Sequence, residues 1–238
     1  MNFDLKYIMD SFAPILAKLP ITFYMTIAAT ILALVVGTIF AVLIEKKIFF
    51  LSKFLKFFNS LLKGVPVLIF LYVLYYAMPD VLTSLGDKLG FAYDIKNPPK
   101  LFFGILAFGV TYIPYMCEMI ITAYHTVPKG QMEACESMGF TTFQAMRRII
   151  APQMVVVSIP VFGNHFVNIL KATSLAYMVT IIEMMGAAKN YATGTQRFLE
   201  TYIAAAIIYW IICIVFDKLF VLIENNTGKY RNKVAQAA

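Results

Sequence analysis

Charged residues are scarce in this chain of 238 residues: Asp, Glu, Lys and Arg make up 14% of it, while hydrophobic residues make up 61%. A soluble globular domain carries about 25% charged and roughly 45–50% apolar residues. The composition therefore excludes a soluble enzyme or binding domain and indicates an integral membrane protein. The net charge of +7 does not point to a nucleic-acid partner, because membrane proteins concentrate Lys and Arg at their cytoplasmic face.

Residues that bind metals or cofactors are also few. Cys117, Cys135 and Cys213 lack metal-type spacing, and we expect them to pack as small apolar side chains. The sequence has no Gly-x-x-x-x-Gly-Lys-Ser/Thr segment to hold nucleotide phosphates, so we expect no bound metal or cofactor and a source of energy elsewhere. A membrane-embedded enzyme would need clustered His, Asp or Glu, and the spans offer only Glu118 and His165.

Long apolar stretches dominate the rest of the chain. A spanning helix needs about 20 apolar residues, and this length is met at 21–44, 55–78, 101–124, 149–171 and 202–223. The second of these stretches is interrupted by Lys63-Gly64 and Pro66, and residues 175–185 are too short to span and are expected to be re-entrant or interfacial. We therefore expect an all-α integral membrane protein with a single transmembrane domain over residues 1–238, and no cleaved signal peptide.

The distribution of Lys and Arg predicts how the chain is oriented. With five spans, twelve basic residues fall on one side and seven on the other. Because basic residues favour the cytoplasmic side, the N-terminus is expected outside and the C-terminus inside. The polar segment 126–148, between the third and fourth spans, is then cytoplasmic and open to a soluble partner.

The first half of this cytoplasmic loop is expected to form a short helix. Gly130 lets the chain turn, and Glu133 is placed near a helix N-terminus, where the dipole favours a carboxylate. Ala134 and Cys135 are small, so a partner's backbone can approach closely.

Gly139 is suited to the left-handed conformation that ends a helix. Met138 and Phe140 would then be exposed apolar residues, which mark an interaction surface. The alternative is an ordinary amphipathic helix at the membrane interface, with Arg147 and Arg148 as basic anchors.

Several motifs in this order resemble the permeases of the polar amino-acid uptake family of ABC importers. Residues 129–152 resemble the EAA loop of that family, with Cys135 in place of its usual third alanine. The other matching segments are Lys63-Gly64-Val65-Pro66 (Arg-Gly-Thr-Pro in the family), Pro128 to Gln131, Arg147 to Gln153 (Arg-Arg-Val-Ile-Leu-Pro-Gln), Gly163 to Phe166 (Gly-Asn-Gln-Phe) and Leu170 to Leu175 (Leu-Lys-Asp-Thr-Ser-Leu).

This resemblance implies a type I importer fold in a bacterial cytoplasmic membrane. It implies that a second permease subunit, a dimer of cytoplasmic ABC ATPases and an extracytoplasmic substrate-binding protein assemble with this chain. ATP and Mg²⁺ would bind to the ATPases, and hydrolysis would be transmitted through residues 129–141. The chain would itself be a transport subunit and not an enzyme.

Glu118 is an ionisable residue inside the third predicted span. Such residues usually face a cavity or a partner. Glu118 shares a helix face with Pro114 and Ile121. The family often has arginine where Ile121 stands, so Glu118 lacks an obvious partner and is open to the ammonium group of a ligand. The alternative is that Glu118 is hydrated at the cytoplasmic end or paired with another subunit.

A polar stripe follows in the fourth span. Asn164, Asn168 and Lys171 recur at helical spacing, which indicates a water-filled path; contacts between helices or snorkelling of Lys171 are the alternatives, and for Asn168 we favour such a contact. Thr173 and Ser174 are expected to add neutral hydrogen bonds to a zwitterion.

The substrate class is predicted from a position at which this sequence departs from the family pattern. Ala172 stands where the family frequently has aspartate, which disfavours a strongly acidic pocket and favours a polar or zwitterionic amino acid such as glutamine or cystine. Glu183 resembles an acidic residue of the family and is assigned to the path, with gating and surface pairing both open, while His165 is expected to be a packing residue. A gradient-driven amino-acid carrier is the alternative function, although its inverted repeats are not found.

Overall fold

The computed structural model describes the backbone of residues 3–90 and 100–236 and the side chains of this part up to Thr227. Within these ranges every regular element is a helix. The elements are α1 (Leu5–Leu16), α2 (Leu19–Glu45), α3 (Phe49–Gly64), α4 (Val67–Leu89), α5 (Lys100–Thr126), α6 (Lys129–Ser137), α7 (Thr142–Ala145), the π-helix η1 (Met146–Ile150), α8 (Ala151–Ala172), the 3₁₀-helix η2 (Thr173–Val179), α9 (Met184–Thr195) and α10 (Phe198–Gln236).

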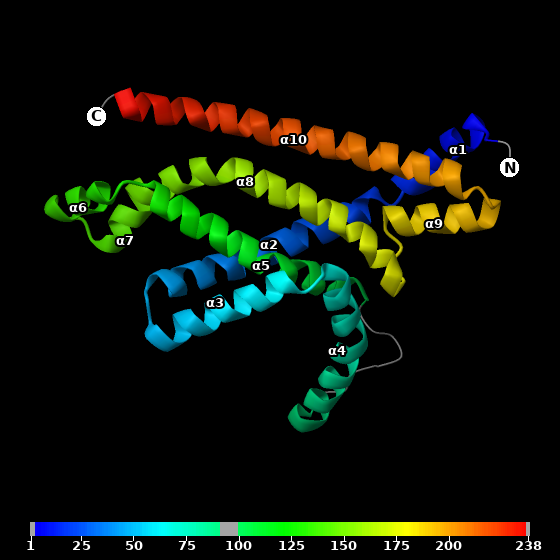
Figure 1. Ribbon diagram of the computed structural model, residues 1–238, viewed down its shortest axis with the longest axis horizontal. Coiled ribbons are helices and arrows are strands. Elements are labelled where there is room, and N and C mark those ends of the chain that lie inside the picture. The colour runs from blue at the N-terminus through cyan, green and yellow to red at the C-terminus, as the bar shows by residue number, and fades with distance from the viewer. Residues whose placement is uncertain (1–2, 91–99, 237–238) are drawn as a thin grey trace.

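Five helical segments in the described part are long and apolar enough to cross a membrane. They are Leu19–Glu45, Val67–Leu89, Lys100–Thr126, Thr142–Val179 and Phe198–Thr227. The predicted all-α membrane architecture with about five spans is therefore confirmed. Helices α2, α5, α8 and α10 run along the long axis of the molecule, with α6, α7 and the last turns of α10 at one end and α1 at the other (Figure 1).

The predicted second span, 55–78, is not one helix. Helix α3 ends at Gly64 and α4 begins at Val67, after Val65 in an extended conformation. Pro66 explains this break, because a proline disfavours the helical conformation of the residue before it. Helix α3 lies alongside α2 and α5, whereas α4 leaves the bundle at a steep angle (Figure 1). The membrane-length helix in this region is α4.

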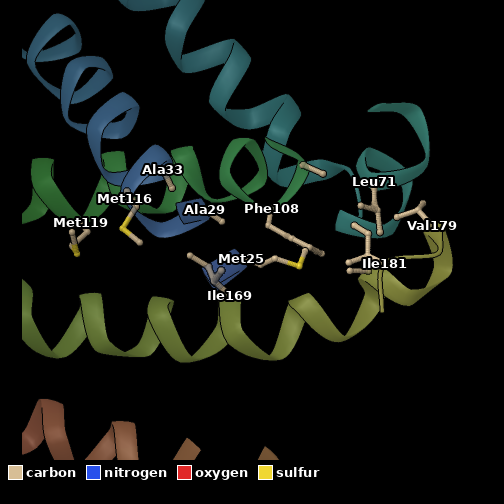
Figure 2. Packing of buried hydrophobic residues seen from close by; sticks show 12 residues of the cluster. Met25, Ala29, Ala33, Leu71, Phe108, Met116, Met119, Ile169, Val179 and Ile181 are labelled. Atoms are coloured by element: carbon tan, nitrogen blue, oxygen red, sulfur yellow. The ribbon is translucent and has the colours of Figure 1, made fainter. Parts of the chain in front are cut away.

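The core of the bundle is the interface between α2 and α5. Met25, Ala29 and Ala33 of α2 face Phe108 and Met116 of α5, with α8 closing the cluster from below (Figure 2). Small residues on α2 allow the two backbones to approach closely, as is usual where membrane helices pack. A Cβ atom added at Gly37 of α2 would lie 2.8 Å from Met116 Cβ and 3.0 Å from the Cys117 amide nitrogen.

Substituting Gly37 by valine should therefore separate α2 from α5. We expect a loss of about 1–3 kcal/mol, the usual cost of overpacking, seen as a lower melting temperature in detergent. Gly194→Val is the matched control, because nothing lies within 4 Å of a Cβ atom at that position. If Gly37→Val melts like the wild type, the close contact between α2 and α5 is wrong.

Candidate functional site

An ion pair joins the end of α3 to the middle of α5. The ammonium group of Lys63, in the last turn of α3, contacts Oε1 of Glu118. The two side chains are 29% and 60% exposed, so the pair is open to solvent. The expectation that Glu118 lacks a partner in its own chain is therefore wrong. The break at Pro66 allows this contact, because α3 stops beside α5 and presents Lys63 at its end.

Aromatic rings lie close to the Lys63–Glu118 pair. The Lys63 ammonium lies 5.4 Å from the ring centroid of Tyr115, close enough for a cation–π attraction. The His165 ring of α8 packs at 5.7 Å from Tyr115 and 6.5 Å from Tyr112. His165 thus packs against aromatic rings, as the sequence indicated, while the two tyrosines were not anticipated.

Two grooves meet at this cluster. One, of about 220 Å³, lies between α5 and α8 and is lined by Glu118, Ser158, His165 and apolar neighbours. The other, of about 300 Å³, surrounds the α3–α4 break and is lined by Lys63, Thr111 and Tyr112 among others. Tyr115 lines both grooves. Each has room for several waters, since one takes up about 30 Å³ in the liquid. Glu118 lines the first groove and Lys63 lines the second.

The polar stripe on α8 faces away from the chain's own bundle. Asn164, Asn168 and Lys171 are all exposed, and none of them lines either groove. Helix α8 is covered instead by α5 and α10. Polar groups exposed to hydrocarbon are costly, so in a membrane this stripe needs water or another protein against it.

The hydroxyl groups after the stripe are already engaged. Thr173 Oγ1 donates to the carbonyl of Leu170 at 2.7 Å, and Ser174 Oγ donates to the carbonyl of Lys171 at 2.7 Å. Thr173 is fully buried and Ser174 is half-buried. In this conformation Ser174 offers only an acceptor, and Thr173 offers nothing to a ligand.

Glu183 is buried and structural in this conformation. It caps α9, accepting from the backbone N–H groups of Gly186 (2.8 Å) and Met185 (2.9 Å) and from the hydroxyl of Tyr209 (2.8 Å). Burial raises the pKa of Glu183, and these hydrogen bonds oppose that shift. Surface pairing of Glu183 is excluded, because its side chain is completely inaccessible. Its hydrogen bond with Tyr209 ties α9 to α10.

The loop of residues 126–148 contains the expected short helix, but this helix begins earlier than predicted. Helix α6 begins at Lys129, so Glu133 lies in its middle and the prediction that Glu133 stands at the N-terminus is wrong. Gly130 and Ala134 are exposed, but Cys135 is buried at 4% exposure, so it packs inside the loop instead of meeting a partner. Proline at 128 explains the early start, because it precedes the first turn without needing a donor.

The end of α6 is as the sequence indicated. Gly139 has φ of +79°, and its amide donates to the carbonyl of Glu136 at 3.0 Å. Met138 beside it is 78% exposed, whereas Phe140 is half-buried. The exposed aromatic residue is Phe143, at 73%. Phe143 lies in the following helix, α7, which was not predicted from the sequence.

Comparisons with known proteins complete this picture. Residues 33–229 match the family described as binding-protein-dependent transport system inner membrane component. The chain belongs to this family. It is an ABC importer permease subunit and a multi-pass membrane protein.

Its relatives include the probable amino-acid permease protein YxeN of Bacillus subtilis (strain 168), 36% identical over 95% of this chain and 96% of that protein. The L-cystine transport system permease protein TcyB of the same organism is 31% identical over 94% of this chain and 91% of that protein. A crystal structure of an amino acid ABC transporter with histidines superposes with a TM-score of 0.79 at 25% identity, covering 95% of this chain and all of that one. The resemblance to amino-acid importer permeases is confirmed.

In this permease the loop is tied directly to a spanning helix. Gln153 Nε2, in the first turn of α8, donates to Oε1 of Gln131 in α6 at 2.6 Å and to the carbonyl of Ile149 at 2.9 Å. Between the loop and α8 lies the π-helix Met146–Ile150, a wider turn that often occurs at functional sites. Thr141 and Gln144 form a capping box that fixes the start of α7.

Proposed function

We propose that this chain forms half of the translocation path of an ATP-driven importer for a zwitterionic amino acid. The observation that carries the proposal is the Lys63–Glu118 pair, which lies at the junction of two grooves. An α-amino acid carries one carboxylate and one ammonium group. It can displace the pair by placing its carboxylate on Lys63 and its ammonium on Glu118, so that no charge is left without a partner.

The remaining lining residues support a neutral side chain on the substrate. Among the described residues around the two grooves, Lys63 and Glu118 are the only Asp, Glu, Lys or Arg. Ser158 and Thr111 offer hydroxyl groups, and Tyr112 and Tyr115 offer rings with a polar tip. Glutamine and cystine fit this composition better than arginine or lysine, and a relative is named as an L-cystine permease.

The partners in this proposal follow from exposed surfaces. A dimer of cytoplasmic ABC ATPases, which bind ATP and Mg²⁺, docks on residues 129–141, where Met138 is exposed. A second permease subunit, identical or related, covers the Asn164, Asn168 and Lys171 stripe, so that the stripe lines the central path. An extracytoplasmic substrate-binding protein delivers the amino acid to the other face, with the N-terminus outside and the C-terminus inside a bacterial cytoplasmic membrane.

Proteoliposomes distinguish this function from a gradient-driven carrier. The permease, its ATPase and its binding protein are reconstituted together, and uptake of labelled glutamine and cystine is measured with ATP inside the vesicles. We expect uptake that requires ATP and the binding protein and persists with ionophores present. Uptake driven by an ion gradient without ATP would overturn the proposal.

The Gln131–Gln153 hydrogen bond predicts that ATP hydrolysis and amino-acid transport can be uncoupled by mutation. Gln131→Ala or Gln153→Ala removes the side-chain link between the loop and α8, while the apolar surface of Met138 stays intact. We expect ATP hydrolysis by the complex to continue while amino acids transported per ATP fall several-fold. The ratio is measured in the same proteoliposomes; an unchanged ratio in both variants would show that the link plays no part in coupling.

A further inference from the structure

A basic and aromatic surface lies where α2 turns into α3. Its four lysines are Lys46, Lys47, Lys53 and Lys56. All four are exposed, and none forms an ion pair with a described acidic side chain. The neighbouring acid, Glu45, is engaged by His125 at 3.1 Å. Four unpaired positive charges within eleven residues repel one another and favour an anionic ligand.

Helix α3 separates these charges from an apolar face. At 3.6 residues per turn, Lys53 and Lys56 share one side of the helix, and the residues that pack against the bundle occupy another. The third side carries three rings, Phe50, Phe54 and Phe57, which are 85%, 57% and 66% exposed. The Lys53 ammonium lies 4.0 Å from the centroid of the Phe49 ring, which links the charged side to the aromatic residues.

We propose that this α2–α3 surface binds an anionic phospholipid. The rings from Phe50 to Phe57 extend about 10 Å along the helix, given a rise of 1.5 Å per residue, which suits acyl chains better than a water-facing protein contact. Lys53 and Lys56 snorkel from the same helix, Lys46 and Lys47 lie in the turn before it, and together they place ammonium groups around a headgroup phosphate. Basic clusters beside membrane helices on the cytoplasmic side are suited to anionic headgroups.

A lipid bound in this way anchors α3 at its first turns, at the opposite end of the helix from the proposed substrate site. Lys63, at the other end of the same helix, holds Glu118. A lipid bound at the first turns of α3 therefore restrains the helix that presents Lys63. The lipid site needs only a membrane-spanning chain and stands whether or not the proposed substrate is right.

Native mass spectrometry of the full-length chain in detergent tests this inference. Phosphatidylglycerol or phosphatidylcholine with identical acyl chains is titrated onto wild type and onto the variant with Lys46, Lys47, Lys53 and Lys56 replaced by glutamine. We expect the wild type to retain phosphatidylglycerol in preference, and the preference to fall about fivefold for each lysine replaced at low ionic strength. A variant with arginine at the four positions should keep the preference.

The matched control replaces four of the seven basic residues that the five-span prediction places on the opposite side of the membrane by glutamine, with the same change in net charge. These four are Lys6, Lys18, Lys88 and Lys189. This variant should keep the preference of the wild type. The proposal is overturned if the α2–α3 variant keeps the full preference, or if the control variant loses it equally. It is also overturned if the α2–α3 variant loses co-purifying ATPase while its lipid preference is unchanged, because the surface would then belong to a protein partner.

Discussion

Replacing Gly139 by valine is expected to reduce uptake about 30-fold or more, the effect of losing an interface contact worth at least 2 kcal/mol. Gly139 has φ of +79°, a conformation that is a genuine outlier for a β-branched residue. Valine forces the turn after α6 to change, and this change redirects the exposed Met138 away from the ATPase. Insertion should be unaffected, because nothing within 4 Å opposes a side chain at this position.

Gly139→Asn separates conformation from the mere presence of a side chain. Asparagine adopts the left-handed region far more readily than valine, so this variant should keep most of the uptake. Both variants are compared in whole-cell uptake at equal amounts in the membrane. An equal loss of uptake in both variants would show that any side chain at position 139 is harmful, whatever the backbone conformation. Unchanged uptake in both would show that this turn plays no part in the mechanism.

Removing either member of the Lys63–Glu118 pair should lower uptake by about 10- to 100-fold, since a hydrogen bond to a charged group contributes about 1.5–3 kcal/mol. Lys63→Met removes the group assigned to the substrate carboxylate, and Glu118→Gln removes the group assigned to its ammonium. Stability should change little, because an exposed ion pair contributes about 1 kcal/mol or less. Uptake and thermal unfolding are measured on the same preparations.

The exchanged variant, Lys63→Glu with Glu118→Lys, decides between a site and a structural contact. It re-forms an ion pair but reverses the charges presented to the substrate. If the pair recognises the zwitterion, the exchange leaves thermal stability near that of the wild type and leaves uptake low. If the pair only holds α3 against α5, the exchange restores uptake as well, and the assignment of the substrate site is wrong.

Local sequence patterns predicted those features of the fold that depend only on residues close together in the sequence. The apolar stretches predicted the number of spans, and Gly139 predicted the end of α6, because glycine adopts that backbone conformation without steric cost. The interruption at Lys63-Gly64 and Pro66 was visible, but its consequence, two helices in different directions, depends on what α3 and α4 pack against.

Contacts between distant segments lay beyond the sequence patterns. Lys63 and Glu118 belong to separate helices, and nothing in their local spacing pairs them. The buried Glu183 accepts a hydrogen bond from Tyr209 of α10, a contact that no helical periodicity encodes. Helix α1 was not anticipated, although Ile8, Ser11 and Ile15, its buried residues, recur at helical spacing.

Affinity purification of the tagged chain from native membranes in mild detergent tests the central claim most directly. Mass spectrometry of the co-purifying proteins should identify an ABC ATPase that is retained by the wild type and by Gly139→Asn and lost from Gly139→Val. The same experiment shows whether a second, related permease is present. A clean homo-oligomer that carries no ATPase under these conditions would contradict the account and favour a gradient-driven carrier.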